Sequence, residues 1–279
     1  MTRPYSPRLS WGVWLHAGAL ILRLSGTAFF IFVAFSALQG GSLEGATAWR
    51  QLEVLTSLVA ASAGWLVSHH LLYQWGRDTR QLHQRTQLAA VPTSPGLRSA
   101  STQVGLQPDQ VVEVVDSSSS VFTYGTYRPR IVISRQLVEE LTPEQLTAVL
   151  LHEESHLRRL DPLRRSLLAV ASATFWYVPA LRQWQSRQVM RQELIADRHA
   201  LDTCGCRALA GALLAVSRDA SGPVAAMGNS ALLGARIAHL EGQTVSPPPL
   251  SRSIVVRSGV GVLCASLVAI GSILILGCP

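Results

Sequence analysis

Two histidines and an acid stand close together at His152, Glu153 and His156, in the order H-E-x-x-H. Residues four apart lie on one face of an α-helix, so the two histidines can present ring nitrogens to the same metal ion. Glu153 lies beside that face, where its carboxylate can take a proton from a water molecule on the metal. Zinc favours nitrogen and oxygen ligands, and a catalytic site keeps one position open for that water. The motif therefore predicts metal-assisted hydrolysis.

The residues around the motif predict the helix that it needs. Thr142 offers an N-cap hydroxyl, Pro143 suits the first turn, and Gln145 stands at the capping-box position. An apolar face follows, made of Leu146, Val149, Leu150 and Leu157. Asp161-Pro162 is expected to end the run. A chance H-E-x-x-H match rarely falls in the middle of a well-capped helix, so this context favours the metal site.

A pair of acids downstream provides candidates for the third protein ligand. Glu193 and Asp197 are four residues apart and share one face of a predicted helix. One carboxylate can bind the metal while the other holds a ligand imidazole in one tautomer. A solvated acidic face would be the better interpretation of this pair alone. Together with the upstream motif, the pair favours the metal site.

Further pieces of sequence accompany these residues in order. They are Phe122–Gly125, Arg128–Ser134, Leu141–Glu144, Leu157–Leu163, Phe175–Trp176 and Glu193–Asp197. With them, the run from Val121 to Leu201 resembles the gluzincin core of integral-membrane metallopeptidases. It is most similar to the BlaR/MecR-type signal transducers of beta-lactam sensing, and order and spacing agree over about eighty residues.

Motif and resemblance together predict a zinc metalloendopeptidase with one Zn²⁺ per chain. His152, His156 and Glu193 are expected to bind the metal as two imidazoles and one carboxylate. Glu153 is expected to act as the general base and then to pass its proton to the leaving amine. Asp197 is expected to orient a ligand histidine without touching the metal.

Two features of this site stay open at the level of sequence. An additional donor to the oxyanion should exist, and Tyr124, Tyr127 and His199 are the candidates, although structural roles are the safer interpretation of all three. Glu154 stands where the resembled family usually has an uncharged residue. A carboxylate beside the zinc is tolerated if it is exposed or paired with an arginine.

The composition is not that of an ordinary soluble domain, because 48% of the residues are hydrophobic and only 15% are charged. The formal net charge of +7 is carried mostly by arginine. In a membrane protein such charge marks loops on the inner side, and its arginines can contact anionic lipid. No stretch has the pattern of a nucleic-acid motif, so we expect no direct contact with nucleic acid.

Three apolar segments are long enough to suggest transmembrane helices, namely Ala17–Leu38, Val54–Trp75 and Ser258–Gly277. The arginines around them place the N-terminus and everything after Trp75 in the cytoplasm. The apolar stretch 166–181 is only sixteen residues long and suits a buried or interfacial helix better. We therefore expect a multi-pass protein of the cytoplasmic membrane.

The predicted fold is a mainly α membrane protein with three transmembrane helices and a cytoplasmic α+β gluzincin-like zinc-peptidase domain. Residues 1–76 would form a membrane region with two of these helices, 77–256 the peptidase domain, and 257–279 the third helix. Strands are expected at 110–115, 120–124 and 130–134. Within the last, Ile131–Ile133 is the candidate edge to which an extended substrate pairs.

The resemblance implies that the substrate, or a partner, is a cytoplasmic transcriptional repressor that binds DNA in a signalling pathway. We expect no sensing through a penicillin-binding domain, because nothing that resembles one follows the last apolar segment. A membrane quality-control protease of the heat-shock or CAAX-protease type is one alternative, since it would use the same site. A non-catalytic, zinc-binding membrane scaffold is another. Glu154 is a hint toward the scaffold, whereas Glu153 argues against it because a structural zinc needs no base.

Overall fold

The computed structural model describes residues 48–115, 120–126, 128–219 and 223–277 and is mostly helical with one small sheet. Its helices are α2 (Ala48–Leu88), α3 (Pro95–Val104), α4 (Arg135–Glu140), α5 (Pro143–Arg159), α6 (Asp161–Thr174), α7 (Ala180–Asp219), α8 (Pro223–Leu240) and α9 (Arg252–Gly277). Packing divides the chain into two units. The larger unit contains 72–172 and 180–252, and the described parts of the other are 48–71, 173–179 and 253–277.

The sheet of the larger unit has three strands, β1 (Val111–Val114), β2 (Val121–Tyr124) and β3 (Arg130–Ser134), in the order β1-β3-β2. β1 runs parallel to β3, and β2 runs antiparallel to it. The turn between β2 and β3 contains Gly125 at a φ of +99°, where a Cβ would lie 3.0 Å from the carbonyl oxygen of Arg128. Glycine is therefore required at this turn.

The predicted substrate edge is wrong, because Ile131–Ile133 lies in the central strand. β1 pairs with one side of β3 and β2 with the other, so the polar backbone groups of β3 are used within the sheet. All three residues are buried in the core. The sequence could not show this, since strand order depends on pairing between distant segments. β2 is the edge strand next to α5.

α5 has the ends that the sequence predicts. The Thr142 hydroxyl accepts a hydrogen bond from the backbone N–H of Gln145 at 3.3 Å, and the Gln145 side-chain oxygen accepts one from the backbone N–H of Thr142 at 3.0 Å. The helix ends at Arg159, and Asp161 and Pro162 form the first turn of the next helix. The capping box and the terminal break are thus confirmed.

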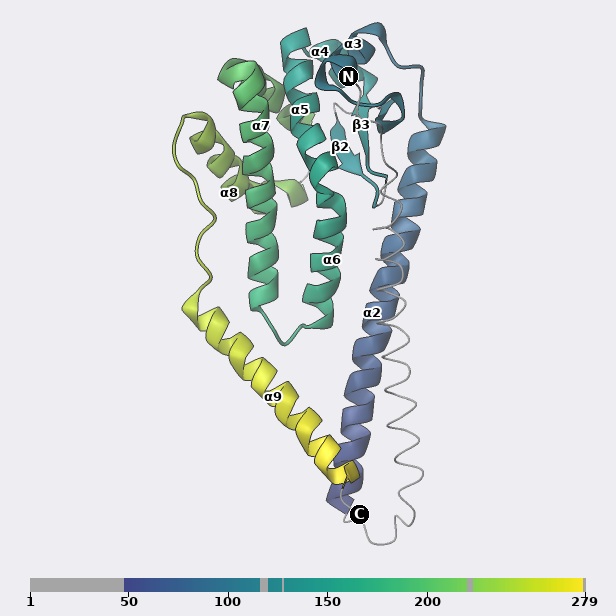
Figure 1. The fold of residues 1–279 in the computed structure, drawn as a ribbon, viewed down its shortest axis with the longest axis vertical. Helices are drawn as coiled ribbons and strands as arrows, with labels where there is room; N and C mark the ends of the chain where they lie inside the picture. The colour runs from purple at the N-terminus through teal and green to yellow at the C-terminus, as the bar shows by residue number, and fades with distance from the viewer. Residues whose placement is uncertain (1–47, 116–119, 127, 220–222, 278–279) are drawn as a thin grey trace, which may run out of the picture. The chain divides into compact units, whose positions relative to one another are not determined.

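α5 lies between the sheet and α7 in the larger unit (Figure 1). Its apolar face packs into the main core together with residues of α3, α4, α7, β1 and β3. The buried members of this core are Leu97, Ala100, Leu106, Val111, Ile131, Ile133, Leu137, Leu141, Leu146, Val149, Leu150, Leu157 and Ala212. α7 packs along a second face of α5, more extensively than any other pair of elements. This packing fixes α5 between two layers.

The predicted fold of three transmembrane helices is contradicted. Among the residues that the structure describes, no helix is long and apolar enough to cross a bilayer. Val54–Trp75 lies within α2 and Ser258–Gly277 within α9, whereas Ala17–Leu38 lies outside the described residues. A span needs about twenty consecutive apolar residues. α2 instead exposes His69 and His70 and continues into charged residues.

The cap of α5 can be tested through stability. Thr142→Ala should lower the free energy of unfolding by about 1 kcal/mol, because the Gln145 N–H loses its acceptor. Thr147→Ala is the matched control, since the Thr147 hydroxyl only donates to the Pro143 carbonyl within the same helix. It should change stability by less than about 0.5 kcal/mol. Urea unfolding of both variants decides the matter, and an equal loss in the two would rule out a specific cap.

Candidate metal centre

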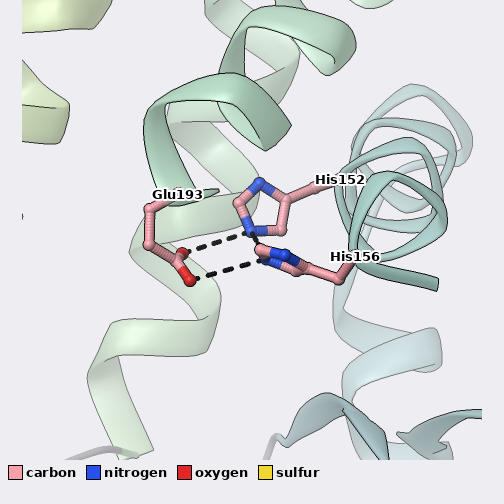
Figure 2. Close-up of side chains that lie close together, drawn as sticks. All are labelled: His152, His156 and Glu193. Carbon is pink, nitrogen blue, oxygen red and sulfur yellow. Dashed lines mark hydrogen bonds and ion pairs between the residues drawn. The ribbon is translucent and has the colours of Figure 1, made fainter. Parts of the chain in front are cut away.

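Three potential ligands meet where α5 packs against α7. His152 and His156 extend from α5, Glu193 extends from α7, and all three side chains point toward one another (Figure 2). The two imidazole Nε2 atoms are 3.3 Å apart. Glu193 Oε2 lies 3.5 Å from Nε2 of His152, and Oε1 lies 3.5 Å from Nε2 of His156. Two nitrogens and a carboxylate thus face one point.

Each imidazole has a carboxylate next to its Nδ1 atom. His152 Nδ1 lies 3.0 Å from Asp197 Oδ1, and His156 Nδ1 lies 2.9 Å from Asp161 Oδ2. A carboxylate at Nδ1 favours the tautomer with its proton on Nδ1, which leaves the Nε2 lone pair free to bind a metal. This donor set, with both Nε2 atoms turned inward, fits a zinc ion.

Asp161 was missed by the sequence analysis, which assigned it only to the end of the helix. Leu160 has a left-handed backbone (φ 53°, ψ 41°), an uncommon conformation for a residue with a branched side chain. The reversal at Leu160 begins α6 directly after α5 and allows Asp161 to reach back to His156. The Asp161 side chain is 1% exposed. An acid just beyond the motif was the available signal.

Two arginines that the sequence analysis did not connect with the site contact its carboxylates. Arg236 of α8 donates to both oxygens of Asp197 at 2.8 and 2.6 Å, and its Nη1 lies 3.4 Å from Glu193 Oε2. Arg165 of α6 donates to Glu193 Oε1 at 2.7 Å and to the Gln192 side chain at 2.8 Å. Each oxygen of Glu193 therefore contacts one imidazole and one guanidinium.

These contacts shift the ionisation of the centre in the absence of metal. Burial alone would lower the pKa of His152, but its contacts with Asp197 and Glu193 outweigh burial and raise the pKa to about 9. Burial likewise opposes ionisation of Glu193 and Asp197, yet His152 and Arg236 hold the pKa of both carboxyls below their usual range. The centre is therefore built to keep its carboxylates charged.

Glu153, the predicted base, lies on the side of α5 that faces the sheet. The Thr123 hydroxyl of β2 donates to Glu153 Oε2 at 2.7 Å. The carboxylate is buried, so this hydrogen bond fixes its orientation next to the ligand histidines. Thr123 could not be identified from the sequence, because its position beside the helix depends on the sheet.

Glu154 is buried rather than exposed, and it has two partners. Arg158, one turn further along α5, forms an ion pair with its Oε1. His199 of α7 lies with Nε2 3.1 Å from its Oε2. The arginine that was expected as a condition for tolerating this acid is therefore present, and the histidine adds a second contact.

The two candidate oxyanion donors that the structure describes, Tyr124 and His199, have other contacts. The Tyr124 hydroxyl lies 3.1 Å from His83 Nδ1 and 3.0 Å from the Thr86 hydroxyl, within a core cluster of the sheet. His199 contacts Glu154, and Tyr127 lies outside the described residues.

Comparison with known proteins gives one family. A model of the family described as BlaR1 peptidase M56 matches residues 30–239, which is most of the chain. The comparison with curated proteins found no match.

The assignment of ligands can be tested by metal content. Glu193→Ala should lose the metal, because the third ligand is gone. Asp197→Ala and Asp161→Ala should each weaken zinc affinity about 10- to 100-fold, since each removes the carboxylate that orients a ligand ring. Asp202→Ala is the control: it removes an exposed acid of the same helix and should leave zinc content and zinc affinity unchanged. Zinc is measured by elemental analysis and by competition with a chelator; normal zinc in Glu193→Ala would disprove the ligand set.

The raised pKa of His152 predicts how the metal-free protein responds to pH. The pKa of His152 is 6.5 in the unfolded chain and about 9 in the fold, so its protonation contributes fully to stability below pH 6.5. This contribution is lost as the pH rises through about 9. The metal-free protein should therefore lose stability between pH 6.5 and 9. His152→Gln should lack this particular loss, and denaturant unfolding at several pH values in the presence of a chelator measures both. A flat profile for the unaltered chain would contradict the prediction.

Proposed function

The chain belongs to the BlaR1 peptidase M56 family, and we propose that it acts as a zinc metalloendopeptidase of the H-E-x-x-H type. M56 peptidases are metallopeptidases, and His152, His156 and Glu193 form a possible metal site. The observation that carries the choice of zinc is the convergence of two inward-facing Nε2 atoms and one carboxylate at 3.3 to 3.5 Å. A retained base beside this set favours catalysis over a scaffold.

The residues of the site divide the chemical work. His152, His156 and Glu193 would hold the zinc, which when bound polarises the scissile carbonyl and makes water a stronger nucleophile. Glu153 takes the proton from the attacking water and later gives it to the leaving amine. Because Thr123 already donates to Oε2 of Glu153, we assign the transferred proton to Oε1. Asp197 and Asp161 keep the two imidazoles in the required orientation.

β2 is the strand best placed to bind an extended substrate. Its residue Thr123 touches the predicted base, and β2 lies at an edge of the sheet. A peptide that adds to this edge would pass Glu153 while its backbone forms hydrogen bonds with β2. We propose this strand, in place of the buried β3, as the position of the substrate backbone.

For the substrate we propose a cytoplasmic DNA-binding repressor, and for the location a membrane with the peptidase domain on its cytoplasmic side. Both rest on the resemblance to BlaR/MecR-type transducers, which are associated with membranes. The net charge of +7 agrees with a protein that works near anionic lipid. The larger unit carries the whole metal centre, so the cleavage would take place on that unit.

The mechanism predicts that Glu153→Gln keeps zinc but loses cleavage. The amide is nearly the same size but cannot accept the proton, so the rate should fall by at least about 10²- to 10⁴-fold. Glu154→Gln is the matched control, because it alters the neighbouring acid, which has no chemical role here; it should retain activity within about tenfold. Cleavage of a quenched fluorescent peptide and zinc content are measured together. A Glu153→Gln protein with near-normal cleavage would rule out the mechanism.

The proposed substrate is tested separately, by cytoplasmic proteomics of cells that carry the unaltered chain or Glu153→Gln. Fragments of one DNA-binding regulator should appear only with the unaltered chain. Fragments of many unrelated damaged proteins would instead identify a quality-control protease. The peptidase assignment survives either result, whereas the repressor hypothesis survives only the first.

A further inference from the structure

α7 borders a cavity that the metal centre does not use. The cavity has a volume of about 830 Å³, within the range of sites that hold small molecules. Its wall includes Trp184, Arg187, Arg191 and Arg198 of α7, His239 of α8, and the segment 245–247 that follows α8. None of the three metal ligands lines it. It is therefore a separate candidate site within the larger unit.

The wall of this cavity carries unbalanced positive charge. Arg198 pairs with Asp202 at 3.0 Å, so its charge is matched by another lining residue. The side chains of Arg187 and Arg191 form no ion pair or hydrogen bond with any other described residue. They are four residues apart on one helix and so face the same side. Two guanidinium groups are thus left to bind an anion from outside the chain.

A third polar atom in the cavity wall also lacks a partner. Nε2 of His239 is buried and has no hydrogen-bond partner among the described residues. A buried ring nitrogen without a partner costs free energy, so such an atom in a native fold calls for an explanation. In the tautomer that carries its proton on Nε2, an oxygen atom of a ligand in this cavity would provide the missing acceptor.

The cavity also has an apolar side. Trp184 is 41% exposed, and Leu194, Ile195 and Pro247 lie in the same wall. Indole rings combine apolar surface with one polar N–H, which suits them to the boundary between the charged and apolar parts of a ligand. The wall therefore suits two kinds of ligand. One is a small anion, and the other is a larger molecule that joins an anionic group to an apolar body.

We propose that this cavity is a phosphate-binding site, and that Arg187, Arg191 and His239 are its donors. Guanidinium groups bind phosphate oxygens through paired N–H donors, and phosphate has enough oxygens to accept from two arginines and an imidazole at once. The phosphate belongs either to a free anion or to the headgroup of an anionic lipid. A lipid would also use the apolar wall beside Trp184.

The test is calorimetric titration of the full chain with three probes. These are inorganic phosphate, dihexanoyl phosphatidylglycerol and dihexanoyl phosphatidylcholine, each lipid below its micelle concentration. A chelator is present throughout, so that phosphate does not bind to metal. Arg187→Gln/Arg191→Gln should weaken binding of the phosphate or phosphatidylglycerol probe at least tenfold. Arg182→Gln/Arg207→Gln, which removes the same charge from exposed positions of α7 outside the cavity, should weaken it less than twofold.

Each outcome either tests the proposed site or identifies the source of the phosphate group that it binds. Binding of inorganic phosphate that depends on Arg187 and Arg191 supports a site for free anions. Binding of phosphatidylglycerol alone, with the same dependence, supports a lipid headgroup site. Equal loss in the two double variants would show unspecific attraction to a basic protein and would overturn the proposal. Absence of binding, or binding of phosphatidylcholine that neither variant alters, would overturn it as well.

Discussion

The structure of the larger unit depends on keeping several charged groups buried in one helix–helix interface. An isolated buried charge costs several kcal/mol, and a pair regains this only if every partner is well placed. Glu193 meets the condition because each of its oxygens contacts one imidazole and one guanidinium. The two guanidinium groups come from Arg165 of α6 and Arg236 of α8. The metal centre therefore constrains where α6 and α8 pack, and not only α5 and α7.

Orientation of the ligand rings depends on two different kinds of structure. Nδ1 of His152 lies 3.0 Å from Asp197 on α7, so this contact depends on packing between helices. The ring of His156 is held by Asp161, only five residues further along the chain. That short connection requires the left-handed turn at Leu160, a backbone conformation in which glycine would be less strained than leucine. Backbone strain retained next to a ligand is consistent with a positional requirement of the site.

The features that the sequence could predict depend on residues close together in the chain. The capping box of α5 and the shared face of His152 and His156 depend on spacing along one helix, so reasoning from periodicity was sufficient. Arg165 and Arg236 reach their carboxylates across 28 and 39 residues, a distance at which spacing carries no information. The place of β3 at the centre of the sheet and the contact from Thr123 depend on strand pairing in the same way. Average apolarity was also insufficient to predict a span in the described residues, and in α2 exposed polar residues such as His69 and His70 interrupt the apolar run.

α7 connects the metal centre with the proposed phosphate site. The α7 residues of both sites lie before Gly205, where a φ of 77° and a ψ of 169° interrupt the helix, so these residues belong to one continuous helical segment. His199 lines the cavity and contacts Glu154, which is next to the predicted base in the chain. A ligand can couple the sites only through contacts that differ between two states. Among the described residues, the contact between His199 and Glu154 joins the cavity wall to α5, and Glu154 is also paired with Arg158.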